Sequence, residues 1–149
     1  MVPGPEDPSV EPIETGSPGS TVEPLRARPR PAEQVDRVLD GGWPAFIGAD
    51  AEAERHLSRV RDVFGGHELA LVAGAGTPGE ELVALGWAVP LRWSGAVGDL
   101  PGGYTDSLGR ALADLDAGAA TDTLVVCAVQ VRADAHGRGL ASRLLAGFV

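Results

Sequence analysis

The sequence has no lysine, no asparagine, a single cysteine and no long apolar run. With one cysteine the chain can form neither an internal disulfide nor a cysteine-based zinc site. Its apolar runs are far shorter than the roughly 18–20 residues that a membrane-spanning helix needs, so we expect no membrane partner. The first residues carry neither a basic segment nor an apolar stretch, which argues against a secretory signal and for a cytoplasmic protein.

Basic charge is scarce and of one kind. All 12 basic residues are arginines, against 21 acidic residues, and the formal net charge is −9. Nucleic-acid binding needs clustered positive charge, so we expect no nucleic-acid partner. We expect no metal cofactor either. Lysine and asparagine codons are rich in A and T, so we interpret their absence as a GC-rich gene and treat arginine as the default cation.

Proline is concentrated at the N-terminus, where residues 1–31 hold eight of the 12 prolines. Glycine, serine and glutamate fill much of residues 1–20, a composition that cannot bury enough apolar surface to offset its ordering entropy. We predict a disordered Pro/Gly/Glu-rich tail over residues 1–20. Residues 21–149 are long enough for one domain with one core.

Hydrophobic periodicity divides residues 21–149 into strands and helices. We predict strands at 22–28, 68–73, 81–93 and 123–131. We predict helices at 32–40, 51–64, 104–117 and 139–149. Asp50 is placed to cap the second of these helices, and paired glycines end the first two. Residues 43–46 are expected to be a loop with two aromatic anchors.

Two of the strands have informative faces. In 81–93 the odd positions are large and apolar, whereas Ala84, Gly86 and Ala88 are small, which suits the close approach of a helix or a ligand. The strand 123–131 is apolar up to Gln130, a pattern typical of a strand buried on both faces. Cys127 lies inside this strand, and we interpret it as a small core residue.

The segment with recognisable chemistry is residues 129–142, where the last strand runs through a loop into a helix. Amides at a helix start lack intrahelical partners and favour anions such as phosphate. Gly137 and Gly139 would let the backbone touch a phosphate. Arg132, Arg138 and Arg143 against Asp134 leave a local charge of +2 in a chain of −9, which also favours an anionic ligand.

Two other phosphate-binding loops fit this segment less well. A dinucleotide-binding loop needs a third glycine where this chain has Ser142, and a Walker A loop needs a lysine, so both are disfavoured. A plain strand-to-helix turn with solvated arginines remains open, because turn glycines are common.

Residues 131–141, Val-Arg-Ala-Asp-Ala-His-Gly-Arg-Gly-Leu-Ala, resemble the acyl-coenzyme A (acyl-CoA) signature of the GNAT superfamily of N-acetyltransferases. That signature is a Val-x-Pro stretch followed by Arg/Gln-x-x-Gly-x-Gly/Ala. His136 stands where arginine or glutamine is usual, and Ala133 where proline is usual. The order of elements over 22–149 also resembles this family.

The resemblance implies an α+β fold around a mixed, mostly antiparallel sheet flanked by helices, with the C-terminal part of that fold missing after Val149. Residues 94–121 would be an insertion with its own helix. Backbone groups of Val129 and Val131 would bind the pantetheine arm of the coenzyme. Its pyrophosphate would be held by residues His136, Gly137, Arg138, Gly139, Leu140, Ala141 and Ser142.

The implied activity is transfer of an acetyl or other acyl group from acetyl-CoA or another acyl-CoA to an amine of a small molecule or peptide. Trp43, Phe46 and Tyr104 are candidates for an acceptor pocket, although core packing is their default interpretation. Asp122 is a weak candidate for the catalytic base, so the catalytic residues stay unassigned. The alternatives are a truncated or degenerate GNAT module without activity, and a structural α/β domain with a Gly-rich turn.

Overall fold

The protein is described by a computed structural model over residues 19–40, 42–43 and 45–149. Its sheet has four strands in the order β1-β2-β3-β4, and every neighbouring pair is antiparallel. The strands are β1 (Ser20–Pro24), β2 (Glu68–Ala73), β3 (Glu81–Leu91) and β4 (Thr123–Val131). The α+β class is therefore confirmed, and the described sheet is antiparallel throughout.

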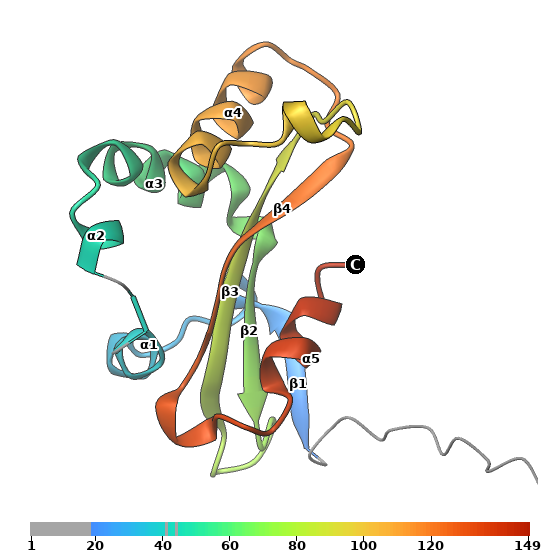
Figure 1. Ribbon diagram of the computed structural model, residues 1–149. Helices are drawn as coiled ribbons and strands as arrows, with labels where there is room; N and C mark the ends of the chain where they lie inside the picture. Colours follow the sequence, from blue (N-terminus) through green and yellow to red (C-terminus); the bar gives the residue numbers. More distant parts are fainter. Residues whose placement is uncertain (1–18, 41, 44) are drawn as a thin grey trace, which may run out of the picture.

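The helices cover the two faces of the sheet unequally (Figure 1). Helices α1 (Ala32–Leu39), α2 (Ala45–Gly48), α3 (Ala51–Phe64) and α4 (Tyr104–Asp116) lie on one side, and α5 (Leu140–Ala146) packs on the other. Short 3-10 turns lie at Leu25–Ala27, Gly65–His67, Val97–Asp99 and Ala133–Ala135. The prediction of a loop over residues 43–46 is wrong for residues 45–46, which form the start of the short helix α2.

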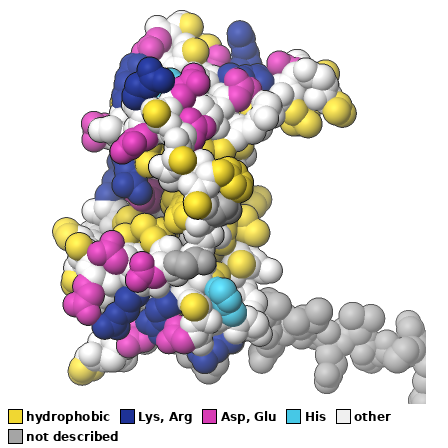
Figure 2. Space-filling view, turned by 60° about the vertical axis from the view of Figure 1, so that its left-hand side comes forward, with side chains coloured by type: hydrophobic (Ala, Val, Ile, Leu, Met, Phe, Trp, Pro, Cys, Tyr) yellow, Lys and Arg dark blue, Asp and Glu magenta, His cyan; other side chains and the backbone are white. Residues whose placement is uncertain are grey.

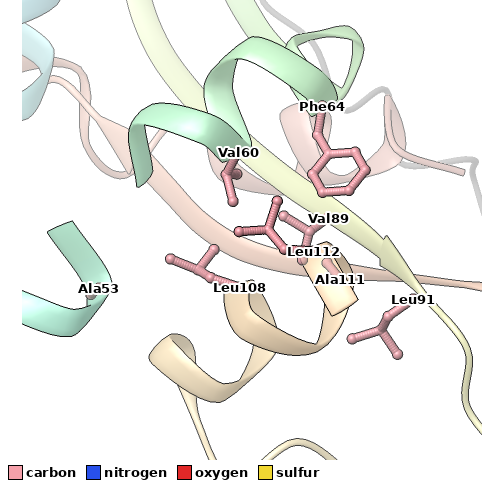
Figure 3. Packing of buried hydrophobic residues seen from close by; sticks show 8 residues of the cluster. All are labelled: Ala53, Val60, Phe64, Val89, Leu91, Leu108, Ala111 and Leu112. Carbon is pink, nitrogen blue, oxygen red and sulfur yellow. The ribbon is translucent and has the colours of Figure 1, made fainter. Parts of the chain in front are cut away.

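Helix α3 forms where its cap and its apolar stripe predict it. The Asp50 side chain accepts hydrogen bonds from the amides of Glu52 and Ala53, as expected of an N-cap. The apolar stripe of α3 packs on α4 and on the upper part of β3 (Figure 3). The buried members of this cluster are Ala53, Val60, Phe64, Val89, Leu91, Leu108, Ala111 and Leu112. Segment 94–121, which we interpreted as an insertion, therefore completes a core through α4.

The small face of β3 accommodates α5, as the sequence pattern predicts. A Cβ atom on Gly86 would lie 3.2 Å from Leu144 of α5 and 2.9 Å from the carbonyl oxygen of Ala128. On the opposite face, Leu85 packs in one buried cluster with Val38 of α1. Val83 departs from the expected alternation and joins the cluster under α5, because the register of β2 and β3 shifts beside it.

Strand β4 has helices on both of its faces, but it is half-buried rather than fully buried as the prediction has it, because one of its edges is open. Within the described residues it pairs with β3 alone. Its residues are half-buried, and Val126 is 38% exposed. The apolar composition of β4 reflects helices on both faces, α5 on one and the α3–α4 pair on the other, rather than a neighbouring strand at each edge.

Several element ends differ from prediction. β1 starts at Ser20, inside the predicted tail, and stops at Pro24, because a 3-10 turn replaces its expected second half. β3 ends at Leu91, two residues early. Pro90 is tolerated because β2 pairs with β3 only as far as Trp87, so no ladder bond needs its missing N–H there. The rest of the predicted tail, residues 1–18, lies outside the described residues.

Candidate functional site

At two of the predicted positions, the free edge of β4 presents backbone groups that make no bond to a neighbouring strand among the described residues. The amide of Arg132 donates to the carbonyl of Val83 on β3 at 2.9 Å. Peptide groups alternate in direction along a strand, so those of residues 129 and 131 point away from β3. Val129 and Val131 therefore direct their N–H and C=O groups to the open edge, while their side chains pack under α5.

The loop that follows β4 folds back beside this edge. Gly137 and Gly139 have φ values of +75° and +70°, a left-handed conformation that glycine adopts without strain. Ala135 and Leu140 are buried and anchor the loop from below. No side chain caps α5, so the first amides of the helix, from Leu140 onward, have no partner within the helix.

A cavity of about 450 Å³ lies between the β4 edge and this loop. Seven of the nine predicted coenzyme-site residues line it, namely Val129, Val131, His136, Gly137, Gly139, Leu140 and Ala141. Gly42, Gln130 and Ala135 complete the lining, and the sequence pattern had not indicated them. The other two predicted residues, Arg138 and Ser142, are exposed and do not line the cavity.

His136 has a defined place in this loop. Its Nε2 atom lies 2.7 Å from the carbonyl oxygen of Val131, so the ring donates a hydrogen bond when Nε2 carries the proton. The bond joins the loop to the strand end. It also engages one of the backbone groups that we predicted for the pantetheine arm, leaving that oxygen's second lone pair for another donor.

Two of the three arginines in this segment are already bound to groups of the protein. Arg132 pairs with Asp134 at 2.5 Å and with Glu81 at 3.1 Å. The Arg132 guanidinium holds the pKa of Asp134 below its usual value. Arg143 donates to the carbonyl oxygen of Ser20. Arg138 makes no hydrogen bond or ion pair to another described residue, so it is the arginine of this segment that is available to an anion bound at the loop.

A second cavity, of about 350 Å³, lies on the α1–α4 side of the sheet. Three of its lining residues are aromatic, and Trp43 stands between the other two. Its ring centroid is 5.2 Å from that of Trp87 and 6.1 Å from that of Tyr104. The two cavities are neighbours, because Gly42 lines the first and Trp43 lines the second.

Two of the remaining candidates take structural roles. Asp122 accepts hydrogen bonds from the Trp93 amide at 3.0 Å and from the Thr123 hydroxyl at 2.8 Å, as expected of a turn residue. These bonds lower the pKa of its carboxyl. Burial raises the pKa of the Cys127 thiol to about 11, so it is a neutral thiol at physiological pH. The described residues include no group of His, Cys, Asp and Glu side chains arranged to hold a metal ion.

Trp87 is the residue whose place the sequence pattern missed. It lies on the face of β3 for which the sequence predicts large apolar residues and is 7% exposed, yet it also lines the aromatic cavity. Periodicity identifies the face of a strand but not whether a helix or a cavity covers it. Trp43 and Tyr104, which we considered for a pocket, do meet Trp87 there.

No protein-family model, curated protein or solved structure significantly matches the chain. No helix within the described part of the chain is both long and apolar enough to cross a bilayer. The function therefore has to be inferred from the chain's own residues and their geometry.

Proposed function

We propose that this chain is an N-acyltransferase of GNAT type that takes an acyl group, acetyl in the simplest case, from acyl-CoA and transfers it to an amine. The observation that carries the proposal is the cavity at the free edge of β4. It is built from the residues of the acyl-CoA signature, which come from a strand, a loop and a helix start. A turn without a ligand would need no such cavity beside an open strand edge.

The chemistry of this cavity suits two neighbouring parts of the coenzyme, the pantetheine arm and the pyrophosphate. The pantetheine arm is an extended chain with two amides, and it could pair with the outward groups of Val129 and Val131 as an added strand does. The pyrophosphate would lie at the loop, facing the amides of Leu140, Ala141 and Ser142 with Arg138 nearby. The left-handed glycines keep side chains out of its way.

The reacting end of the coenzyme would lie farther back along β4, near a β-bulge. Trp87 opposes Ala128 and the next residue of β3 opposes Val126, so Cys127 has no opposite partner. A bulge frees peptide groups from the ladder, and a freed N–H is suited to stabilise an oxyanion. The amine nitrogen would attack the thioester carbonyl, a C–N bond would form, and the C–S bond would break to release the coenzyme thiol.

Binding can be tested by thermal unfolding with and without acetyl-CoA. A ligand that binds only the folded state stabilises it by about 2.7 kcal/mol at a hundredfold excess over Kd. We expect a clear rise in melting temperature for the wild type. We expect none for Gly139→Glu, which adds a carboxylate at the anion-binding loop.

The matched control is Gly118→Glu. Gly118 also has a positive φ, +61°, but lies in the turn between α4 and β4, so this variant carries the same kind of strain and charge away from the cavity. It should keep the acetyl-CoA shift. No shift for the wild type at millimolar ligand, or a shift that survives Gly139→Glu, would contradict the proposal. A shift without release of free coenzyme thiol on a panel of amines would identify a binding module without turnover.

A further inference from the structure

We propose that the acceptor is a protonated amine carrying an aromatic ring, with the ring in the aromatic cavity and the ammonium group in the adjoining acidic cavity. This inference rests on the proposed acyltransferase function for its role as acceptor, but its binding chemistry can be tested alone. It is drawn from two cavities on the α1–α4 side of the sheet that share one residue, Tyr104.

The aromatic cavity is suited to a flat ring. The Trp43 ring is tilted by 31° to the Trp87 ring and by 59° to the Tyr104 ring. Its centroid distances to them, 5.2 and 6.1 Å, are in the range at which aromatic rings attract one another. Leu39 and Leu57 supply apolar walls. Figure 2 shows hydrophobic side chains gathered in the middle of this face, between the upper and lower parts of the molecule.

A polar atom of this cavity makes no regular hydrogen bond among the described residues. The indole N–H of Trp87 is buried and no described residue meets the geometry of an acceptor for it, although the Tyr104 hydroxyl lies close enough for the indole to act on the pKa of that phenol. Buried donors are normally satisfied, so an unpaired one beside a cavity indicates that a ligand or water accepts from it. The electron-rich face of a ligand ring, or an oxygen substituent on it, would serve as acceptor.

The adjoining cavity, of about 530 Å³, is acidic. Asp50, Glu52 and Asp106 line it with His56, and no arginine does. Asp50 and Asp106 already accept hydrogen bonds from the protein, whereas Glu52 is exposed, with an oxygen 4.0 Å from His56. The carboxylates disfavour an anion and favour a cation at this end.

The aromatic cavity itself carries one charge of each sign at its lining, Glu54 and Arg61. The Arg61 guanidinium lies 6.0 Å from the Trp87 ring centroid and so takes up the cation site over that ring. The net charge of the two cavities is therefore negative at the acidic end and balanced at the aromatic end. A ligand that matches both has its ring and its ammonium at opposite ends.

Tyr104 connects these cavities with the proposed reaction centre. It packs against the same core cluster as Cys127, which marks the β-bulge of β4. Burial raises the pKa of its phenol, which therefore stays protonated at neutral pH. An ammonium group beside Tyr104 is thus near the part of β4, at the bulge, where the thioester would lie, and it must lose a proton before attack.

The test is a titration followed by intrinsic tryptophan fluorescence in a Trp93→Phe background, which leaves the two cavity tryptophans as the only tryptophan reporters. The probe is 2-phenylethylamine. The matched controls are 3-phenylpropanoate, which has the ring with a negative charge, and butylamine, which has the ammonium without a ring. We expect 2-phenylethylamine to bind about tenfold more tightly than either control.

Two variants locate the binding. Trp43→Ala should weaken 2-phenylethylamine binding about tenfold by removing the central ring. Glu52→Gln should weaken the amine and leave 3-phenylpropanoate unweakened, and the exposed Glu33→Gln on α1 is its charge-matched control. Equal affinity for the three probes, no binding of any of them, or an amine affinity unchanged by both variants would overturn the inference.

The acetyl-CoA melting experiment separates this inference from the proposed function. An acetyl-CoA shift without amine binding overturns the acceptor assignment and leaves the acyltransferase proposal in place. Amine binding without an acetyl-CoA shift overturns the acyltransferase proposal and leaves the ligand class of the two cavities in place.

Discussion

Two physical requirements place glycines at the site, a left-handed backbone conformation and a close approach between elements. Gly137 and Gly139 adopt left-handed backbone conformations that carry the chain from β4 into α5. Gly86 has an ordinary backbone but sits where β4 and α5 approach β3 closely. The sequence indicated Gly137 and Gly139 from their spacing, and Gly86 from the small face of its strand. It could not indicate Gly42, whose proximity to Gln130 depends on how α1 docks on the sheet.

Gly86→Ala is expected to destabilise the fold by about 1–3 kcal/mol, the usual cost of overpacking a core. The new Cβ atom would lie 2.9 Å from the carbonyl oxygen of Ala128, a backbone atom that can move only with its strand. Urea denaturation measures the change. The control is Gly98→Ala, where a Cβ atom would meet nothing within 4 Å. Equal stability of the two variants would contradict the close approach.

At the level of elements, α5 shows how packing rather than helix propensity builds the site. It spans seven residues, too few for an isolated helix to be stable in water. Leu140 and Leu144 are buried against β2, β3 and β4 and hold it in place. The periodicity of these leucines predicted the helix correctly, but its end was set too late, because the helix stops at Ala146 and Gly147 follows as its C-cap.

Leu144→Ala should lower the free energy of unfolding by about 2–5 kcal/mol, the range for a large-to-small change at a fully buried leucine. It should also reduce any melting shift with acetyl-CoA, because the helix start forms one wall of the cavity. Urea denaturation and thermal melts measure the two effects. Leu145→Ala, at a neighbouring position that is 42% exposed, should change stability by about 0.5 kcal/mol or less. A similar loss in both variants would show that Leu144 does not anchor α5.

For the molecule as a whole, the net charge stays at −9, and some of the acidic side chains are held in specific ion pairs. Glu23 and Glu80 share Arg28 and Arg30, which tie the N-terminal strand to the turn between β2 and β3. The Arg30 side chain is only 8% exposed. The pattern of charges along the sequence does not reveal this network, because Glu80 lies 52 and 50 positions from the two arginines with which it pairs.

Stability is expected to fall in acid partly through Glu80. A hydrogen bond from the Gly76 amide, followed by the contact with Arg30, lowers the pKa of Glu80 from 4.5 to about 2. A lowered pKa in the folded state stabilises the protein above pH 4.5, and this contribution is lost as the pH falls from 4.5 towards 2. Glu80→Gln should therefore be less stable than the wild type at pH 7, and the difference should vanish near pH 2. Urea denaturation at several pH values measures it, and a difference that stays constant over this range would contradict the assignment.

The sequence by itself determined the features that depend on neighbours along the chain. These are the cap at Asp50, the apolar stripes of α3 and α4, the small face of β3, and the strand-loop-helix segment that lines the first cavity. Each arises from local backbone geometry or from one-dimensional periodicity, and both can be read from residue order.

Folding determined the features that depend on contacts between distant segments. Examples are the open edge of β4, the bulge at Cys127, the meeting of Trp43 with Trp87 and Tyr104, and the pairing of Arg132 with Glu81. Strand order, register and helix docking bring these residues together, and a shift of one residue in register would turn each side chain to the other face. For this reason the sequence predicted the loop for which we propose anion binding, whereas the proposed acceptor cavity emerges only from the packed structure.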